Sequence, residues 1–373
     1  MKKYYNKIRR QNITIKPKKS ILDIAPYIPG KSGSLNNKLV IKLSSNETPL
    51  GTSNKALKII KNSSGNLARY PDGSSQELRK AIGNFHNINI DNIICGNGSD
   101  EILSMIANCF AGPGDEILYS KHGFLVYPIA TKAAGANPIV ASEINYKADV
   151  KEILKVCSKE TKVCFIANPN NPTGTYLTRK ELITLREELP NDCLLVIDSA
   201  YAEYVDREDY TNGIELAHIY NNIICTRTFS KIYGLAALRI GWAYASKEVV
   251  ELLNRIRLPF NINTIAQQAA IAALHDTKFI DDAINHNNIW KPFIEKELQK
   301  NGIEIIPGVG NFVLAKFNNT KQANACYDYL EKNNIFVRKV AEYGLPEFLR
   351  ITIGLEKENI FVSKIINEFM KKN

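Results

Sequence analysis

The sequence predicts an α/β protein with a large domain, built on a mostly parallel sheet covered by helices, and a smaller α/β domain. The chain has 373 residues, about 2.5 times the length of a typical 150-residue domain. Hydrophobic residues make up 45% and charged residues 23%, the balance of a globular protein with a sizeable core. Short apolar runs alternate with helical patterns from about residue 90 to 245.

The apolar runs are the predicted strands of the large sheet. They are rich in Ile, Val and Leu on both faces, which is typical of strands covered on both sides. In chain order they are Asn92–Cys95, Glu116–Tyr119, Asn137–Val140, Lys162–Ala167, Leu194–Asp198, Asn222–Thr226 and Ile240–Ala245.

Two of the intervening helices have recognisable first residues. Ser74 is followed three residues later by Glu77, the pattern of a capping box, and predicts a helix that runs to Phe85. Thr178 can cap a second helix that runs to about Glu188.

The pattern changes after Ala245 to long helical stretches and then to a second mixture of strands and helices. The expected helices are Lys247–Arg257, a helix from Thr264 toward Lys300 after the break at Pro259, Lys321–Asn333 and a closing helix from Glu356. The expected strands are Ile303–Ile306, Phe312–Lys316, Ile335–Arg338 and Phe348–Ile353. This second mixture predicts the smaller domain.

Composition excludes several classes of protein. No apolar run approaches the 18 residues of a membrane span, and the first residues lack the apolar stretch of a secretory signal, so we expect a cytoplasmic protein. The seven cysteines lack C-x-x-C spacing and are expected to be reduced and mostly buried. No Cys/His group has zinc spacing, so no metal site is expected.

The net charge of +10 is concentrated in the first 20 residues, which contain eight Lys and Arg and no acid. A basic arm could bind nucleic acid, but this one lacks the interleaved glycines and aromatics of an RNA-binding stretch and any recognisable groove-reading helix. We therefore expect residues 1–20 to form a flexible, solvated arm.

Lys231 is the most informative residue of the sequence. It closely follows a predicted buried strand, at the carboxyl end where open α/β sheets bind ligands. Hydroxyls precede it at Thr228 and Ser230, and Arg239 follows it. A lysine that can form an imine, grouped with hydroxyls and an arginine that can hold a phosphate, is the arrangement that pyridoxal phosphate needs.

Three other segments lie at predicted carboxyl ends of strands. Asp198 ends an apolar strand shortly before Tyr201, and a buried carboxylate needs a partner, such as a pyridinium nitrogen; a helix cap or an ion pair is the alternative. Residues 168–174 follow another strand and could equally be an ordinary Asn/Pro/Gly turn. Residues 95–101 join a strand to a helix through glycines, so their amides can bind phosphate, but the G-x-G-x-x-G of dinucleotide sites is absent.

The order of these motifs, G-N-G-S-D-E, N-P-N-N-P-T-G, D-S-A-Y and R-T-F-S-K with a downstream arginine, resembles the fold-type-I pyridoxal phosphate aminotransferases. Within them it is most similar to the histidinol-phosphate aminotransferases, from Ser45-Asn46-Glu47 to the segment 349–354. The expected division is a large cofactor-binding domain over 46–260, a small domain over 261–373 joined through a long helix, and a segment 21–45 that packs with the small domain.

The resemblance implies a role for each cofactor-binding residue. Lys231 would be the Schiff-base lysine and the proton shuttle between the substrate Cα and C4′ of the cofactor. Asp198 would pair with the pyridinium nitrogen, and Phe124, where many relatives have tyrosine, would stack on the ring. Asn171 and Tyr201 would bind the 3′-oxygen. The phosphate would be held by the amides of Ser99 and Asp100, the hydroxyls of Thr228 and Ser230, and the guanidinium of Arg239.

The resemblance also implies substrate contacts. Arg350 matches the arginine that binds the α-carboxylate of glutamate and 2-oxoglutarate. Arg338 matches an arginine that faces the substrate phosphate, with a surface charge as the alternative, and Tyr27 and Asn46 match pocket residues, although Tyr27 could simply pack. Tyr70 matches a tyrosine that reaches the cofactor phosphate of a neighbouring subunit, which implies a homodimer with shared active sites.

The expected reaction is pyridoxal-phosphate-dependent transamination between L-histidinol phosphate and 2-oxoglutarate, giving imidazole-acetol phosphate and L-glutamate in histidine biosynthesis. The alternatives are an aromatic amino-acid aminotransferase, a threonine-phosphate-type decarboxylase on the same scaffold, and a cofactor-retaining binding protein without turnover. Thr48 stands where relatives commonly have asparagine, and residues 120–123 replace a more usual proline-containing turn, which leaves the preferred amino donor open.

Overall fold

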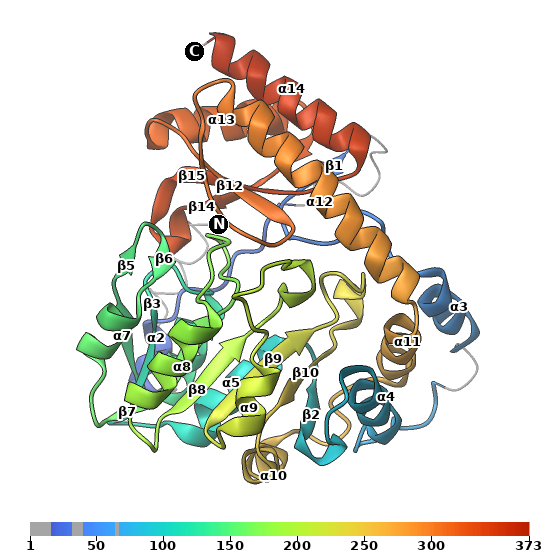
Figure 1. Cartoon of the computed structure of the whole chain (residues 1–373), viewed down its shortest axis with the longest axis vertical. Coiled ribbons are helices and arrows are strands. Elements are labelled where there is room, and N and C mark those ends of the chain that lie inside the picture. Colours follow the sequence, from blue (N-terminus) through green and yellow to red (C-terminus); the bar gives the residue numbers. More distant parts are fainter. Residues whose placement is uncertain (1–15, 32–39, 64–66, 373) are drawn as a thin grey trace.

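The computed structural model describes residues 16–31, 40–63 and 67–372. Figure 1 shows a large lower part around one sheet and a smaller upper part around a second sheet. Most of the predicted basic arm, residues 1–15, lies outside the described residues, and a short helix, α2 (Lys19–Leu22), packs beside α6 (Val126–Ala134) of the large part.

The large sheet has seven strands in the order β2-β10-β9-β8-β7-β3-β4. Their bounds are β2 (Ile93–Gly96), β3 (Glu116–Ser120), β4 (Asn137–Ala141), β7 (Thr161–Ala167), β8 (Leu194–Asp198), β9 (Ile223–Thr228) and β10 (Gly241–Tyr244). Only β10 among them is antiparallel to its neighbours, so the predicted, mostly parallel sheet and all seven of its strands are confirmed. A separate hairpin of β5 (Glu143–Ile144) and β6 (Lys147–Ala148) lies outside this sheet.

Helices cover both faces of the large sheet because successive strand residues point to opposite sides. In β8, Leu195 and Ile197 pack in one core cluster, while Leu194 and Val196 pack in another. The first cluster is closed by α3 (Asn54–Asn62), α4 (Gln76–His86), α8 (Arg179–Glu188), α9 (Ile214–Ile219) and α11 (Thr264–Leu274). The second is closed by α5 (Ser99–Phe110), α6 and α10 (Lys247–Ile256). Asp198 ends β8 on the side of Val196.

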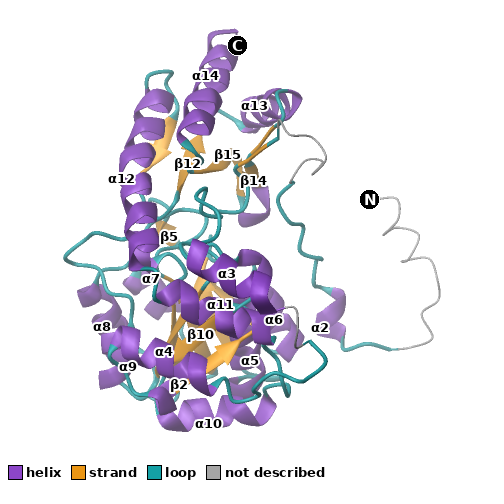
Figure 2. Cartoon of the chain, turned by 90° about the vertical axis from the view of Figure 1, so that its right-hand side faces the viewer, coloured by secondary structure: helices purple, strands orange, loops and turns teal. Residues whose placement is uncertain are grey.

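The small sheet has four antiparallel strands in the order β11-β12-β15-β14, with bounds β11 (Glu304–Ile306), β12 (Phe312–Lys316), β14 (Arg338–Val340) and β15 (Leu345–Thr352). One face is covered by α12 (Thr277–Gln299), α13 (Thr320–Lys332) and α14 (Glu356–Lys372), as Figure 2 shows. The other face, which includes Phe348, packs toward Leu125 of the large part. Arg350 shares the face of Phe348 because side chains alternate along β15.

The N-terminal segment joins the two parts. Its short strand β1 (Ile41–Lys42) pairs in parallel with β13 (Ile335–Phe336), and residues 44–47 then continue toward the carboxyl edge of the large sheet. The helix predicted from Thr264 toward Lys300 is two helices, α11 and α12, separated at His275 and Asp276, and α12 spans both parts (Figure 1). The domain boundaries stay a prediction.

The two predicted helix starts differ in outcome. Thr178 forms its capping box, since its hydroxyl accepts from Glu181 N at 3.2 Å and the Glu181 carboxylate accepts from Thr178 N at 2.7 Å. The capping box of Ser74 and Glu77 is wrong. Asp72 caps α4 instead, because its carboxylate accepts from Ser74 N at 2.8 Å and from Gln76 N at 2.7 Å, and the chain turns through a left-handed Ser75.

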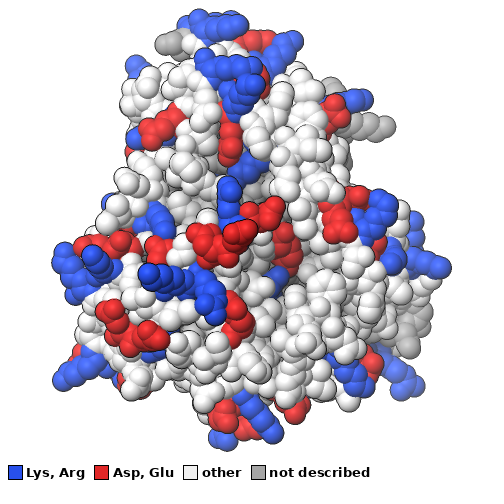
Figure 3. Space-filling view, viewed as in Figure 1, with Lys and Arg blue, Asp and Glu red and all other residues white. Residues whose placement is uncertain are grey.

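Charges of both signs are interspersed on the face shown in Figure 3. In the described ranges, no helix is both long enough and apolar enough to cross a membrane. The seven cysteines are all free thiols, and five of them are buried.

Candidate active site

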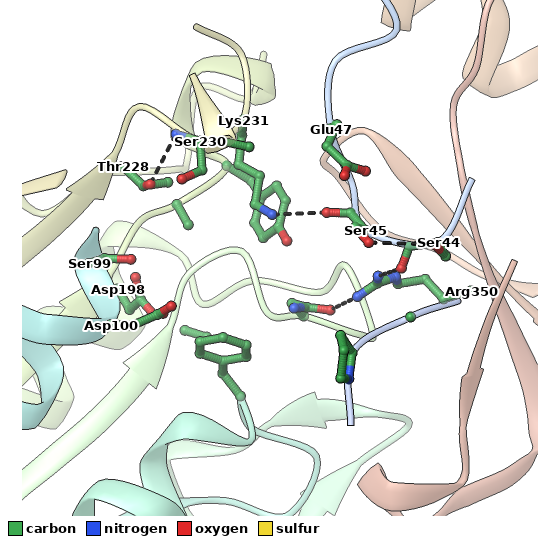
Figure 4. Close-up of a pocket in the computed structure, with 18 of the residues that line it drawn as sticks. Ser44, Ser45, Glu47, Ser99, Asp100, Asp198, Thr228, Ser230, Lys231 and Arg350 are labelled. Atoms are coloured by element: carbon green, nitrogen blue, oxygen red, sulfur yellow. Dashed lines mark hydrogen bonds between the residues drawn. The ribbon is translucent and has the colours of Figure 1, made fainter. Parts of the chain in front are cut away.

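A cavity of about 370 Å³ lies at the carboxyl ends of β7, β8 and β9, between the large sheet and the N-terminal segment 44–47. The large part contributes the end of β8 at Asp198 and the first turn of α5 to one side of it, and the small part contributes Arg350 to the other (Figure 4). Ligands of open α/β sheets bind at this edge.

Twelve of the fifteen predicted site residues line this cavity. They are Tyr27, Ser99, Asp100, Phe124, Asn171, Asp198, Tyr201, Thr228, Ser230, Lys231, Arg239 and Arg350. The other three, Asn46, Tyr70 and Arg338, do not line it. The roles assigned to all fifteen residues stay predictions, because the structure fixes their places and not their functions.

Lys231 occupies the middle of the cavity. Its Nζ donates a hydrogen bond to Ser45 O at 3.1 Å (Figure 4). The same atom lies 5.6 Å from the centre of the Tyr201 ring. The lysine thus reaches from the loop after β9 toward the N-terminal segment. An amine in this position can contact a ligand that lies between the sheet edge and Arg350.

Asp198 is a buried carboxylate with two neutral donors. Thr226 Oγ1 donates to it at 2.9 Å and Tyr127 Oη at 3.0 Å. Burial raises the pKa of Asp198 to about 6; the two hydrogen bonds oppose this, Asp100 raises it further and Lys231 lowers it. A cationic N–H partner would relieve the cost of burying this charge.

Sequence reasoning missed both partners of Asp198. Thr226 is opposite Asp198 in the β8–β9 register, on the same face of the sheet. Tyr127 lies three residues after Phe124, in the first turn of α6. Tyr127 could have been found because it lies in a segment that already contained a predicted site residue. Thr226 could be found only from the pairing of β8 with β9, which the sequence does not give.

Arg239 organises the end of the cavity near α5. Its Nη1 donates to Ser230 Oγ at 3.1 Å and its Nη2 to Asp100 at 3.2 Å, while Ser230 N donates to Thr228 Oγ1 at 3.1 Å. Gly98 precedes α5 with φ +84°, and a Cβ built on it would overlap Arg239 Nη2. A guanidinium, two hydroxyls and the first amides of a 12-residue helix form a site for a phosphate.

Arg350 is buried on the opposite side. Its Nη1 donates to Asn171 Oδ1, its Nη2 donates to Ser44 O at 2.8 Å, and its Nε has no hydrogen-bond partner. A planar guanidinium with a donor to spare matches a carboxylate or a phosphate. Asn171, predicted to bind the cofactor, is thus hydrogen-bonded to Arg350, predicted to bind the substrate.

Asn46 lies behind Tyr201 and not on the cavity surface. Its Nδ2 donates to Tyr201 Oη at 2.9 Å. Thr352 Oγ1 accepts from the backbone N–H of Asn46 at 3.0 Å and donates to Asn46 Oδ1 at 3.0 Å. Asn46 is also left-handed, with φ +59°, a conformation that asparagine tolerates. The residue therefore orients the Tyr201 hydroxyl.

Arg338 pairs in register with Arg350 on the neighbouring strand β14, but it does not line the cavity. Its guanidinium lies 5.7 Å from the ring centre of Tyr27 and 3.3 Å from the Glu342 carboxylate. It is buried, so the alternative of a surface charge is wrong. The half-exposed ring of Tyr27 lines the cavity and contacts Arg338.

Tyr70 lies away from the cavity. Its side chain is 81% exposed, and its ring stacks on that of Phe260 at 4.6 Å. Leu67 and Leu258 are also exposed among the nearby segments. The structure of one chain thus gives Tyr70 no contact with its own cavity.

Pyridoxal phosphate fits the donor set of the cavity. The phosphate site around Arg239, the amine of Lys231 and the buried carboxylate of Asp198 supply partners for its phosphate, its aldehyde carbon and its ring nitrogen. Because Gly98 has no Cβ, the Arg239 guanidinium can lie against its backbone. Fold and site together are those of an aminotransferase built on a mostly parallel sheet.

Comparison with known proteins agrees. The family described as "Aminotransferase class I and II" matches residues 38–362, so the chain belongs to this family. Within it, the chain is similar to proteins named histidinol-phosphate aminotransferase. It is 45% identical to that of Paramagnetospirillum magneticum over 356 residues, 95% of this chain and 98% of the relative. It is 47% identical to that of Nitrobacter hamburgensis, with the same coverage of both chains.

Solved structures give the same result. The crystal structure of histidinol-phosphate aminotransferase from Sinorhizobium meliloti, in complex with pyridoxal-5'-phosphate, matches with a TM-score of 0.85 and 25% identity. The match covers 90% of this chain and 92% of that one. The predicted fold class and family are thereby confirmed.

Proposed function

We propose that this chain catalyses the pyridoxal-phosphate-dependent transfer of an amino group between L-histidinol phosphate and 2-oxoglutarate, a step of histidine biosynthesis. The products are imidazole-acetol phosphate and L-glutamate. The observation that supports this most is the grouping of Lys231, Asp198, the Arg239 phosphate site and Arg350 around one cavity. The similarity to histidinol-phosphate aminotransferases over 95% of the chain supports the choice of substrate.

When bound, the cofactor supplies an electron sink for the bond that is broken at the substrate carbon. Lys231 Nζ would take the proton from this carbon and deliver it to C4′ of the cofactor, from its position over the Tyr201 ring. Asp198, held by Thr226 and Tyr127, would keep a positive charge on the ring nitrogen. Tyr201, oriented by Asn46, would donate a hydrogen bond to the 3′-oxygen of the cofactor.

Arg350 binds both kinds of substrate. Its planar guanidinium group donates hydrogen bonds to the carboxylate of glutamate or 2-oxoglutarate, and the same geometry suits a phosphate. Arg338 adds a second positive charge one strand away, behind Tyr27. Two guanidinium groups on one side favour a phosphorylated donor over an aromatic amino acid, which carries a carboxylate alone.

The test is a steady-state comparison of histidinol phosphate, phenylalanine and tyrosine as amino donors to 2-oxoglutarate, with cofactor-loaded protein. We expect kcat/KM to favour histidinol phosphate by a factor of about 100, or about 2.7 kcal/mol in transition-state binding. A preference for the aromatic amino acids would replace this proposal with an aromatic aminotransferase. Release of carbon dioxide from threonine phosphate without a keto acid would replace it with a decarboxylase.

We further propose that the enzyme works as a cytoplasmic homodimer with shared active sites. Seven free cysteines suit a reducing compartment. The exposed, stacked pair of Tyr70 and Phe260, beside Leu67 and Leu258, is an apolar surface that a second copy of the chain would cover. Tyr70 would then reach the phosphate of the partner's cofactor.

A further inference from the structure

A second cavity, of about 280 Å³, lies between α12, the loop after the short helix η3 (Ala202–Tyr204) and the turn 308–310. It shares no lining residue with the active-site cavity. Its volume is close to the lower end of small-molecule sites, which begin at about 300 Å³. Its polar lining residues include Lys291, Glu295 and Asn287 of α12, and Asp206 and Arg207 of the loop.

Lys291 is a buried cation in this cavity. Its Nζ donates to Gly308 O, and the Glu295 carboxylate, at 3.9 Å, is the acid paired with it. Burial lowers the pKa of Lys291 to about 8; Glu295 opposes the shift and the positive charge of Arg207 adds to it. A bound anion between the two cations would offset the cost of burying the Lys291 charge and the repulsion between Lys291 and Arg207.

Asn287 supplies an unpartnered acceptor on the same helix face. It lies one turn before Lys291, so both side chains point to the same side of α12. Asn287 is 5% exposed, and its Nδ2 donates to Gly310 O at 3.3 Å, whereas its buried Oδ1 has no hydrogen-bond partner. A ligand N–H that donates to this buried oxygen would satisfy it.

We propose that this cavity is a second binding site, for a free α-amino acid. The carboxylate of the ligand lies against Lys291 and Arg207, and its ammonium group donates to Asn287 Oδ1, one turn before Lys291 on α12. Two cations and one unpartnered acceptor in a small cavity match the two charges of a zwitterion, whereas a plain carboxylate would leave Asn287 Oδ1 unpaired.

The wall of this second site is also the back of the active site. Gly310, which accepts from Asn287, lies against Tyr201, since a Cβ built on Gly310 would be 3.8 Å from Tyr201 Cβ. The next two residues continue the contact: Asn311 Nδ2 donates to Asn46 O at 3.0 Å, and Phe312 meets the Tyr201 ring edge-on at 5.3 Å. Residues 310–312 therefore connect the wall of the second site with Tyr201 of the active site.

Calorimetric titration of the holoenzyme with L-histidine, and with acetate as a probe without an amino group, tests the proposal. We expect L-histidine to bind the second site, and Lys291→Met to weaken that event at least tenfold while any event at the active site stays unchanged. Acetate should bind the second site at least tenfold more weakly than L-histidine. No binding of L-histidine to the unmodified protein, or unchanged binding to Lys291→Met, would overturn the proposal.

A surface variant keeps the test independent of folding. Arg207 is exposed, so Arg207→Gln should weaken the same event even if the buried Lys291→Met fails to fold. If L-histidine binds the second site of Arg207→Gln as tightly as in the unmodified protein, the placement of the carboxylate is contradicted. Because binding is measured without turnover, these outcomes do not depend on which amino donor the enzyme prefers.

Proton uptake gives a second readout. The groups around Lys291 are Glu295 on its own helix, Asp206 and Arg207 on the facing loop, and Tyr204 on η3. At pH 8, binding of the carboxylate should protonate the lysine, so the measured heat should depend on the ionisation enthalpy of the buffer. Lys291→Met should abolish this dependence, and its persistence would count against the site.

Discussion

At the scale of a single residue, the buried carboxylate of Asp198 suits a cationic ring. Without the cofactor, the same buried charge lowers the stability of the folded chain. The carboxyl group has a pKa of about 6 in the folded chain and an ordinary value of 3.8. The folded state therefore binds this proton more tightly than the unfolded state does. The free energy of unfolding falls as pH rises from about 4 to about 6, and the loss is complete above pH 6, at about 3 kcal/mol.

Asp198→Asn is accordingly predicted to stabilise the cofactor-free chain at pH 7.5, by at most about 3 kcal/mol, because the amide carries no charge to bury. The gain should disappear at pH 4, where the native carboxyl group is protonated. Thermal unfolding of both cofactor-free proteins at the two pH values measures it. In the loaded enzyme the same change should lower kcat by orders of magnitude, and a near-normal kcat would contradict the role of Asp198.

The residues that line the active-site cavity were predictable where the local sequence indicates their position. Asp198 and Lys231 lie at or just after the ends of apolar strands, and this position in the pattern was enough to predict that they share one site. Thr226 and Asn46 were harder, because their contacts depend on strand register and on a segment about 150 residues from Tyr201. Asn46 was assigned to the pocket surface, but it acts behind Tyr201.

At the scale of an element, the start of α5 depends on a glycine. Gly98→Ala would force a Cβ into Arg239 Nη2 at φ +84°, so we predict at least a tenfold rise in the dissociation constant of the cofactor. Gly114→Ala is the matched control, since Gly114 has φ +97° and no atom within 4 Å of a built Cβ. Equilibrium dialysis of both variants measures the effect. Equal loss of affinity in both would show that backbone strain alone is responsible.

The short helix η3 is anchored to β9 by a buried ion pair. Arg227 Nη2 donates to Glu203 at 2.6 Å, and the two side chains are 4% and 12% exposed. Glu203→Gln would leave the guanidinium buried without its counter-charge, so we predict a loss of about 3–5 kcal/mol in the free energy of unfolding. Denaturant unfolding measures it.

The control for this ion pair is Asp192→Asn, which breaks a pair between Lys162 and Asp192 at the surface. Exposed pairs contribute about 0–1 kcal/mol, so Asp192→Asn should change little. A similar loss in both variants would contradict the importance of burial at Glu203.

The sequence predicted some helix boundaries correctly and others wrongly, and each outcome has a physical reason. Thr178 caps α8 because its partner Glu181 is local, and local signals can be seen in the sequence. At α4, Ser74 and Glu77 offered the same signal, but Asp72 is a stronger acceptor within reach of the same free amides. The break between α11 and α12 has no proline or glycine to mark it, so the sequence suggested one helix.

At the scale of the whole molecule, we predict that two inactive variants restore activity when mixed. Lys231→Ala lacks the reactive amine, and Tyr70→Ala lacks the proposed contact to the partner's phosphate. In a mixed dimer one site contains both changes and the other contains neither. Refolding the two variants together should therefore recover activity that neither shows alone.

Each variant refolded alone is the control for the mixing experiment. No recovery, although mixed dimers are detected by mass, would contradict the shared site.

The overall architecture was predictable because the alternation of apolar strands and helices repeats over 150 residues, and each repeat reinforces the same fold class. The pairing of β1 with β13 was not, since two-residue strands leave almost no pattern.

That pairing has a consequence for the order in which the protein matures on the ribosome. Ile41 pairs with Ile335, about 300 residues later in the chain, and Ser44 O meets Arg350. At roughly 5–20 residues per second, synthesis separates the two partners by about 15–60 s. Residues 44–47 are made early but can dock only after β13 and β15 have been made, so no nascent chain has a complete active site before β15 has emerged.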